Sequence, residues 1–102
     1  MKRLSDEHVN LIARRARALG DETRVRILDI LARSEQPVGQ IAAALDSQPS
    51  TVSKHLQVLF HAGLVQRRRS ASTVIYSIAD ADLMNWCRYL AAQQLASRTM
   101  RA

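Results

Sequence analysis

Residues 49–62 combine an apolar stripe with a set of hydrogen-bonding side chains, a pattern typical of an amphipathic helix. The stripe consists of Val52, Leu56 and Leu59, which recur at helical spacing. Ser50, Thr51, Ser53, Lys54, His55 and Gln57 supply hydroxyl, ammonium, imidazole and amide groups. Such groups can bond base edges and phosphate oxygens, and a helix of this kind fits the major groove of duplex DNA.

A shorter helix precedes this one, and the two together predict a helix-turn-helix over residues 38–63. Between them, Asp46-Ser47-Gln48 indicates a tight turn. Pro49 suits the first turn of the second helix, where its missing N–H costs nothing, and Gly63 suits the end of that helix. An ordinary pair of packed helices with a solvated polar face is the alternative interpretation.

A basic β-hairpin, called the wing and spanning residues 64–78, follows the second helix directly. Two strands are predicted at residues 64–69 and 73–78, and in the second Val74, Tyr76 and Ile78 alternate with Ile75 and Ser77 at a period of two. The first strand carries Arg67, Arg68 and Arg69. A run of arginines is often only a solvated surface. Next to a recognition-type helix, it favours contact with the nucleic-acid backbone.

Helices are also predicted at both ends of the chain, over residues 5–19 and 80–97. Ser5 and Asp21 can cap helix starts, and Gly20 suits the C′ position of the first helix. The terminal helices carry apolar side chains on one side, notably Val9, Ile12, Leu83, Cys87 and Leu90. These stripes predict either core packing within the chain or a dimer interface. The next helix, which Asp21 can cap, is apolar enough to be a central buried helix, and Pro37 marks the break after it.

The predicted fold is mainly α with a small β-hairpin, in the order α-α-α-α-β-β-α, as one winged helix-turn-helix domain over residues 1–102. The net charge of +6 favours a polyanionic partner, but charge alone does not separate DNA, RNA and anionic membrane. A single cysteine and no visible signal or membrane-spanning segment predict a cytoplasmic protein.

Three stretches of the chain resemble the ArsR-type (arsenic-repressor-like) bacterial winged-helix repressors. They are Ala18-Leu19-Gly20-Asp21-Glu22-Thr23-Arg24-Val25-Arg26-Ile27-Leu28, then Ser50-Thr51-Val52-Ser53-Lys54-His55-Leu56-Gln57-Val58-Leu59, then Ala62-Gly63-Leu64-Val65 with Tyr76 on the second strand. The middle stretch is the most specific, and the resemblance covers nearly the whole chain.

The resemblance implies a homodimer that binds an inverted repeat near a promoter, with the first and last helices forming the dimer interface. One departure from the family pattern concerns the wing. Many members have Glu-Gly-Arg at its tip, whereas this chain has Ser70-Ala71-Ser72. A basic contact at the tip is therefore lost, and Arg67 to Arg69 are the candidates to replace it.

Many members of this family release DNA on binding a metal, but the residues of the known sites are missing. Residues 36–41 contain no thiol, and no His follows Asp80 and Asp82. Two carboxylates without imidazole are poor zinc or nickel ligands, and helix capping explains them better. No metal site and no cofactor are predicted. Cys87 is expected to be a small packing residue, with an intersubunit redox contact as the alternative.

The sequence thus predicts a dimeric, sequence-specific DNA-binding repressor that is not an enzyme. The expected DNA contacts are Gln48, Ser50, Thr51, Ser53, Lys54, His55, Arg67, Arg68 and Arg69, with bracing of the helix as the alternative role of His55. The expected interface residues are Val9, Ile12, Leu83, Cys87 and Leu90. Two alternatives stay open at this point: a redox-responsive repressor switched through Cys87, and an architectural protein that binds nucleic acid without sequence preference.

Overall fold

The computed structural model describes the backbone of residues 2–101 and the side chains of residues 2–93. Along the chain the elements are α1 (Asp6–Leu19), α2 (Glu22–Arg33), β1 (Gln36–Pro37), α3 (Val38–Leu45), α4 (Pro49–His61), β2 (Val65–Ser70), β3 (Thr73–Ile78) and α5 (Asp82–Arg101). The predicted class, mainly α with a β-hairpin, is confirmed. The strand β1 is an addition that the sequence did not predict.

Side-chain caps start α1 and α2 where the sequence predicted them. The Ser5 hydroxyl oxygen accepts a hydrogen bond from the His8 N–H at 3.1 Å, and Asp21 Oδ1 accepts one from the Arg24 N–H at 3.0 Å. Each bond satisfies a donor that the helix cannot pair internally. Gly20 ends α1, but with φ −81° it does not adopt the left-handed conformation expected of a C′ glycine.

Both helices of the helix-turn-helix end in a Schellman motif. At the end of α3, Asp46 has φ 52°, and the N–H groups of Ser47 and Asp46 donate to the carbonyls of Ala42 and Ala43. At the end of α4, Gly63 has φ 76°, and the N–H groups of Leu64 and Gly63 donate to the carbonyls of Leu59 and Phe60. These motifs end α3 and α4 sharply, so the turn between them is short and fixed.

The strands form one antiparallel sheet in the order β1-β3-β2. In the hairpin Arg67 lies opposite Tyr76 and Ser70 lies opposite Thr73, which leaves two residues at the tip. On the other side of β3, Gln36 pairs with Tyr76. The predicted break at Pro37 is in fact part of this edge strand, a position that tolerates proline because an edge strand pairs on only one side.

An aliphatic core fills the space between α2, α3, α4 and the sheet. Its fully buried members are Ile27, Leu28, Ile41, Val52, Leu56 and Leu59, and Tyr76 is the one aromatic side chain buried with them. The terminal helices contribute little: Ala18 is the buried residue of α1. Among the described residues, no helix is long and apolar enough to cross a membrane.

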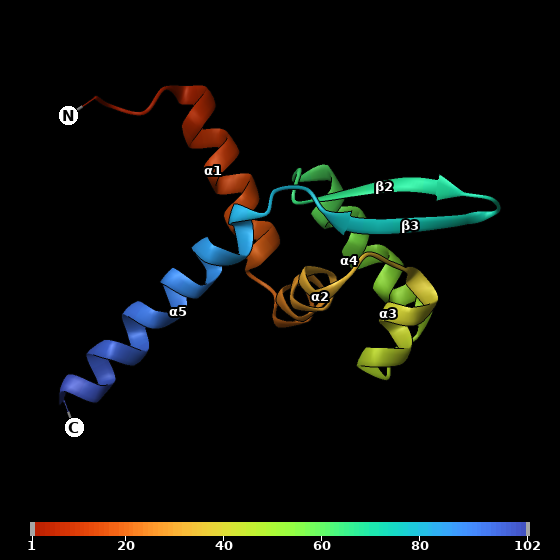
Figure 1. Ribbon diagram of the computed structural model, residues 1–102. Helices are drawn as coiled ribbons and strands as arrows, with labels where there is room; N and C mark the ends of the chain where they lie inside the picture. Colours follow the sequence, from red (N-terminus) through yellow and green to blue (C-terminus); the bar gives the residue numbers. More distant parts are fainter. Residues whose placement is uncertain (1, 102) are drawn as a thin grey trace.

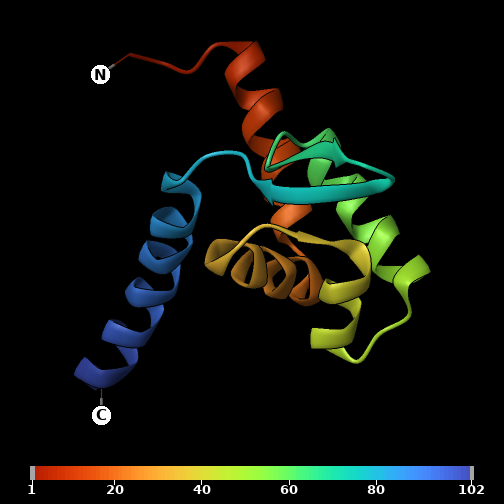
Figure 2. The same cartoon turned by 45° about the vertical axis from the view of Figure 1, so that its right-hand side comes forward.

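The terminal helices and the wing lie at opposite ends of the molecule (Figures 1 and 2). α1 and α5 diverge from the body on one side, and the β2–β3 hairpin projects from the other (Figure 1). The radius of gyration is 15.6 Å, whereas a compact domain of this length has about 13 Å. The chain therefore extends its terminal helices beyond its own core.

Candidate nucleic-acid interface

The exposed side of α4 is the polar surface that the sequence predicted. Ser50, Thr51 and Lys54 are exposed, whereas Val52, Leu56 and Leu59 on the other side are completely buried against α2, α3 and β2. Gln48, just before the helix, is exposed as well. α4 is therefore braced from behind and presents hydroxyl, amide and ammonium groups outward, as a helix in the major groove requires.

The beginning of α4 is open to an anion. Pro49 occupies the first turn, and the N-cap residue Gln48 makes no side-chain capping bond. Backbone N–H groups at such an end carry partial positive charge and bind phosphate well. The Ser50 and Thr51 hydroxyls stand beside these groups. This geometry suits a DNA phosphate at the rim of the groove.

Two of the predicted DNA contacts are turned partly inward. Ser53 and His55 are half-buried. The His55 Nδ1 atom lies 3.4 Å from Arg24 Nη1 and 3.9 Å from Asp21 Oδ1, so the imidazole contacts the α1–α2 corner rather than open solvent. The arrangement favours a bracing role for His55 over direct contact with a base.

Asp21 and Arg24 form the other half of this contact. The Arg24 N–H donates to the Asp21 carboxylate, and the charge of Arg24 adds to the effect, so the pKa of Asp21 lies below its ordinary value despite partial burial. The Arg24 guanidinium donates to the carbonyls of Ala18 at 2.7 Å and of Arg17 at 3.1 Å. Arg24 thus helps to cap the end of α1 by pairing carbonyl groups of its last turn.

The three wing arginines do not share one environment. Alternation along β2 places Arg67 and Arg69 on one face of the strand and Arg68 on the other. The Arg67 guanidinium lies over the Phe60 ring of α4, 3.9 Å from its centroid, and Arg68 is paired with Glu35. Within residues 2–93, Arg69 has no hydrogen-bond or ion-pair partner. The expectation that all three contact the DNA backbone stays a prediction, and alternation along the strand separates Arg68 from Arg67 and Arg69.

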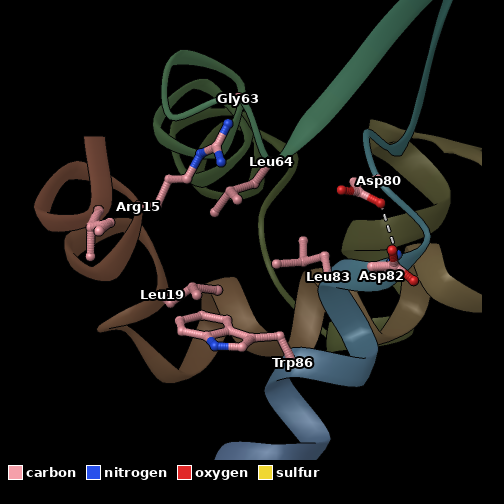
Figure 3. A pocket seen from close by; sticks show the side chains of 9 residues that line it. Arg15, Leu19, Gly63, Leu64, Asp80, Asp82, Leu83 and Trp86 are labelled. Atoms are coloured by element: carbon pink, nitrogen blue, oxygen red, sulfur yellow. Dashed lines mark hydrogen bonds between the residues drawn. The ribbon is translucent and has the colours of Figure 1, made fainter. Parts of the chain in front are cut away.

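A groove of about 480 Å³ runs between α1, α5 and the residues just before β2 (Figure 3). Ile12, Leu19, Leu64, Leu83 and Trp86 form its apolar walls, and Arg15, Asp80 and Asp82 lie at its edges. Asp80 Oδ1 accepts a hydrogen bond from the Asp82 N–H at 2.9 Å, as a capping role requires. Among the described residues, no group of three His, Cys, Asp or Glu side chains could hold a metal ion.

Exposed apolar side chains gather on the terminal helices next to this groove. This terminal-helix surface consists of Val9, Ile12, Trp86, Tyr89 and Leu90, each between 46% and 59% exposed. Of the other predicted interface residues, Leu83 packs partly on the protomer's own core and Cys87 is half-buried. Burial raises the pKa of the Cys87 thiol, which lowers its thiolate fraction and disfavours a redox role.

Reasoning from the sequence missed several residues that the structure brings to the site. Gln57 was placed in the polar set but not among the expected DNA contacts, and it is exposed on α4 one turn beyond Lys54. Arg24 and Arg15 were not singled out, since an arginine that bonds distant carbonyls has no local sequence pattern. Trp86 was also missed, and its place on the terminal-helix surface follows from the same helical spacing as Leu90.

Comparisons with known proteins identify the family. A sequence model described as "Bacterial regulatory protein, arsR family" matches residues 21–67. The chain is 34% identical over 93 residues to the "Probable mercury resistance operon repressor" of Streptomyces lividans, covering 88% of this chain and 74% of that protein. It is 42% identical over 74 residues to the "Transcriptional repressor SmtB homolog" of Synechocystis sp., a match that covers 72% of this chain and 56% of that relative.

The fold agrees with these matches. The solution structure of the homodimeric winged helix-turn-helix DNA-binding domain of Mb0332 from Mycobacterium bovis superposes with a TM-score of 0.82 at 35% identity. That match covers 93% of this chain and 94% of that one. The family match includes α2, α3 and α4 in full and the beginning of β2. The chain belongs to the ArsR family of bacterial regulatory proteins and has a winged helix-turn-helix fold.

Proposed function

We propose that this protein is a dimeric, sequence-specific transcriptional repressor that binds an inverted-repeat operator in the cytoplasm. The observation that carries the proposal is α4 itself, whose three central apolar side chains are completely buried while Ser50, Thr51, Lys54 and Gln57 face solvent. A helix with one buried apolar side and one exposed polar side can lie in the major groove while it stays packed on its own protein.

The phosphate contacts in this proposal come from two places. The uncapped beginning of α4 and the Ser50 and Thr51 hydroxyls meet one strand of the duplex. Arg69, with Arg67 beside it on the α4 side of the wing, meets the backbone next to the groove. Arg68 is a weaker candidate because Glu35 already neutralises it. His55 supports α4 from behind.

Dimerisation through α1 and α5 follows from the terminal-helix surface. A monomer that leaves Trp86, Tyr89 and Leu90 about half exposed, next to a groove lined by apolar residues, has apolar surface left to bury. The related Mb0332 domain is homodimeric. Two copies related by a two-fold axis would present two α4 helices to two half-sites of opposite direction.

Repression would follow from occupancy, because a dimer bound over a promoter blocks polymerase sterically. The two curated relatives described above are named as repressors. No effector is part of the proposal.

Selection of bound duplexes from a random pool tests the function. We expect one enriched inverted repeat with half-sites about one helical turn apart, bound roughly 10³-fold or more tightly than random duplex. Equal affinity for all duplexes would instead favour an architectural protein, and the repressor proposal would be wrong. Repeating the selection with oxidant, on the parent and on Cys87→Ser, decides the redox alternative.

A further inference from the structure

We propose that Arg24 is a positioning residue that fixes the angle between α4 and α1, and thereby the spacing of half-sites that the dimer accepts. The inference rests on the proposed function, in which α4 contacts the operator and α1 belongs to the dimer interface. It adds a determinant of operator choice that lies away from the DNA.

The Arg24 side chain joins three helices. It starts on α2, donates from Nε and Nη2 to the last carbonyls of α1, and places Nη1 3.4 Å from His55 Nδ1 on α4. The guanidinium has no acceptor atom, so a hydrogen bond between these two atoms has Arg24 as the donor and His55 Nδ1 as the acceptor. The planar guanidinium holds its donors in a fixed fork, so the three contacts constrain one another. A lysine could not make them together.

The carbonyls at the end of α1 attract this cation. Unpaired carbonyls at a helix C-terminus carry partial negative charge. Gly20 has φ −81° and forms no Schellman motif; its N–H donates to the Arg17 carbonyl, and the Arg24 fork adds a second donor there and pairs the Ala18 carbonyl. The orientation of α1 at this corner therefore depends on a side chain that also contacts α4.

A second arginine joins the same two helices at another point. Arg15 of α1 donates from Nε to the Ala62 carbonyl at 3.2 Å, at the end of α4. His55 and Ala62 are seven residues apart, which is roughly 10 Å along a helix axis. One contact would fix a distance and leave rotation free. Two contacts this far apart fix the direction of α4 as well.

The consequence appears only in the dimer. Two recognition helices must reach half-sites about 34 Å apart, so a small change of angle between α1 and α4 moves each helix out of its groove. Loss of Arg24 should therefore weaken binding to the complete operator more than binding to one half-site. It should also reduce the penalty for half-sites at the wrong spacing.

The test compares Arg24→Met with Arg26→Met, using the operator obtained by random selection. Arg26 is on the same helix, and its guanidinium pairs with exposed Glu22 one turn away. Affinities are measured for the operator, for versions with the half-sites one base pair closer or farther, and for a single half-site. For the parent and Arg26→Met we expect at least a ten-fold penalty at wrong spacing. For Arg24→Met we expect the penalty to shrink several-fold while half-site affinity is unchanged.

His55→Leu and His55→Gln provide a second measurement if Arg24→Met fails to fold. Both leave the bonds from Arg24 to α1 in place, and Gln restores an acceptor. His55→Leu should show a reduced penalty for wrong half-site spacing. His55→Gln should recover most of the penalty that the parent shows. Parent-like spacing dependence in Arg24→Met, or in His55→Leu, would overturn the proposal. A parent protein without sequence preference would overturn the proposed function itself.

Discussion

Individual side chains at the α1–α2 corner have roles that their residue types alone do not reveal. Asp21 was predicted as a helix cap and is one, because capping needs only an oxygen at the right position before the helix. His55 was expected either to contact DNA or to brace the helix, and it is half-buried against Arg24. Its position on α4 relative to α2 depends on helix packing, which residue type and spacing do not encode.

Asp21→Asn should lower the free energy of unfolding at neutral pH, because Asn keeps a capping oxygen but loses the charge beside Arg24. The folded state lowers the pKa of Asp21 below its ordinary value of 3.8, so the charged form is the one that folding favours. The stability that the Asp21 charge contributes is complete at pH values above the ordinary pKa of 3.8. It is lost as the pH falls through the lowered pKa of the folded state.

Urea unfolding between pH 7 and acid conditions measures this effect, with Asp29→Asn, an exposed position on the same helix, as the control. The difference between the parent and Asp21→Asn should shrink below the ordinary carboxyl pKa. A difference that stays constant down to the most acid sample would show that Asp21 acts without its charge.

At the scale of elements, most boundaries could be predicted from the sequence. Caps at Ser5 and Asp21, Pro49 in a first turn and Gly63 at a helix end all act through local backbone chemistry, and all are observed. β1 could not be predicted, because two residues are too few to show a period and its pairing with β3 is non-local.

The wing provides a prediction at this scale. Arg69→Ala should reduce the dependence of operator binding on salt by about one unit of slope, the contribution of one phosphate contact. Arg68→Ala should leave the slope nearly unchanged, since Arg68 lies on the opposite face of β2 and pairs with Glu35. Binding is measured over a series of salt concentrations for the parent and both variants. An unchanged slope for Arg69→Ala would remove the wing from the DNA contacts.

At the scale of the whole molecule, the chain divides into a core and two projecting helices. The sequence could predict apolar stripes on α1 and α5 but not whether the protomer buries them, since a stripe looks the same in a core and in an interface. The structure leaves Val9 and Ile12 each 52% exposed and covers Leu83 in part.

Ile12→Glu should convert the dimer to monomers without unfolding the chain, because the side chain is exposed in the protomer. Each dimer carries the change twice, and one buried Ile contributes about 1.5 kcal/mol or more, so the dissociation constant should rise about a hundredfold or more. Sedimentation of the parent and the variant measures this. Val58→Glu on α4, also exposed, is the control and should keep the dimer mass. An unchanged mass for Ile12→Glu would place the interface elsewhere.

The affinity of Lys54→Ala for the selected operator tests most directly whether α4 contacts DNA. Lys2→Ala removes the same charge at a position outside α4 and serves as the matched control. We expect Lys54→Ala to bind at least about five-fold more weakly at fixed salt, since one good base contact is worth about 1–3 kcal/mol, with stability unchanged because Lys54 is exposed. We expect Lys2→Ala to bind like the parent. If Lys54→Ala binds the operator as tightly as the parent, α4 is not the recognition helix.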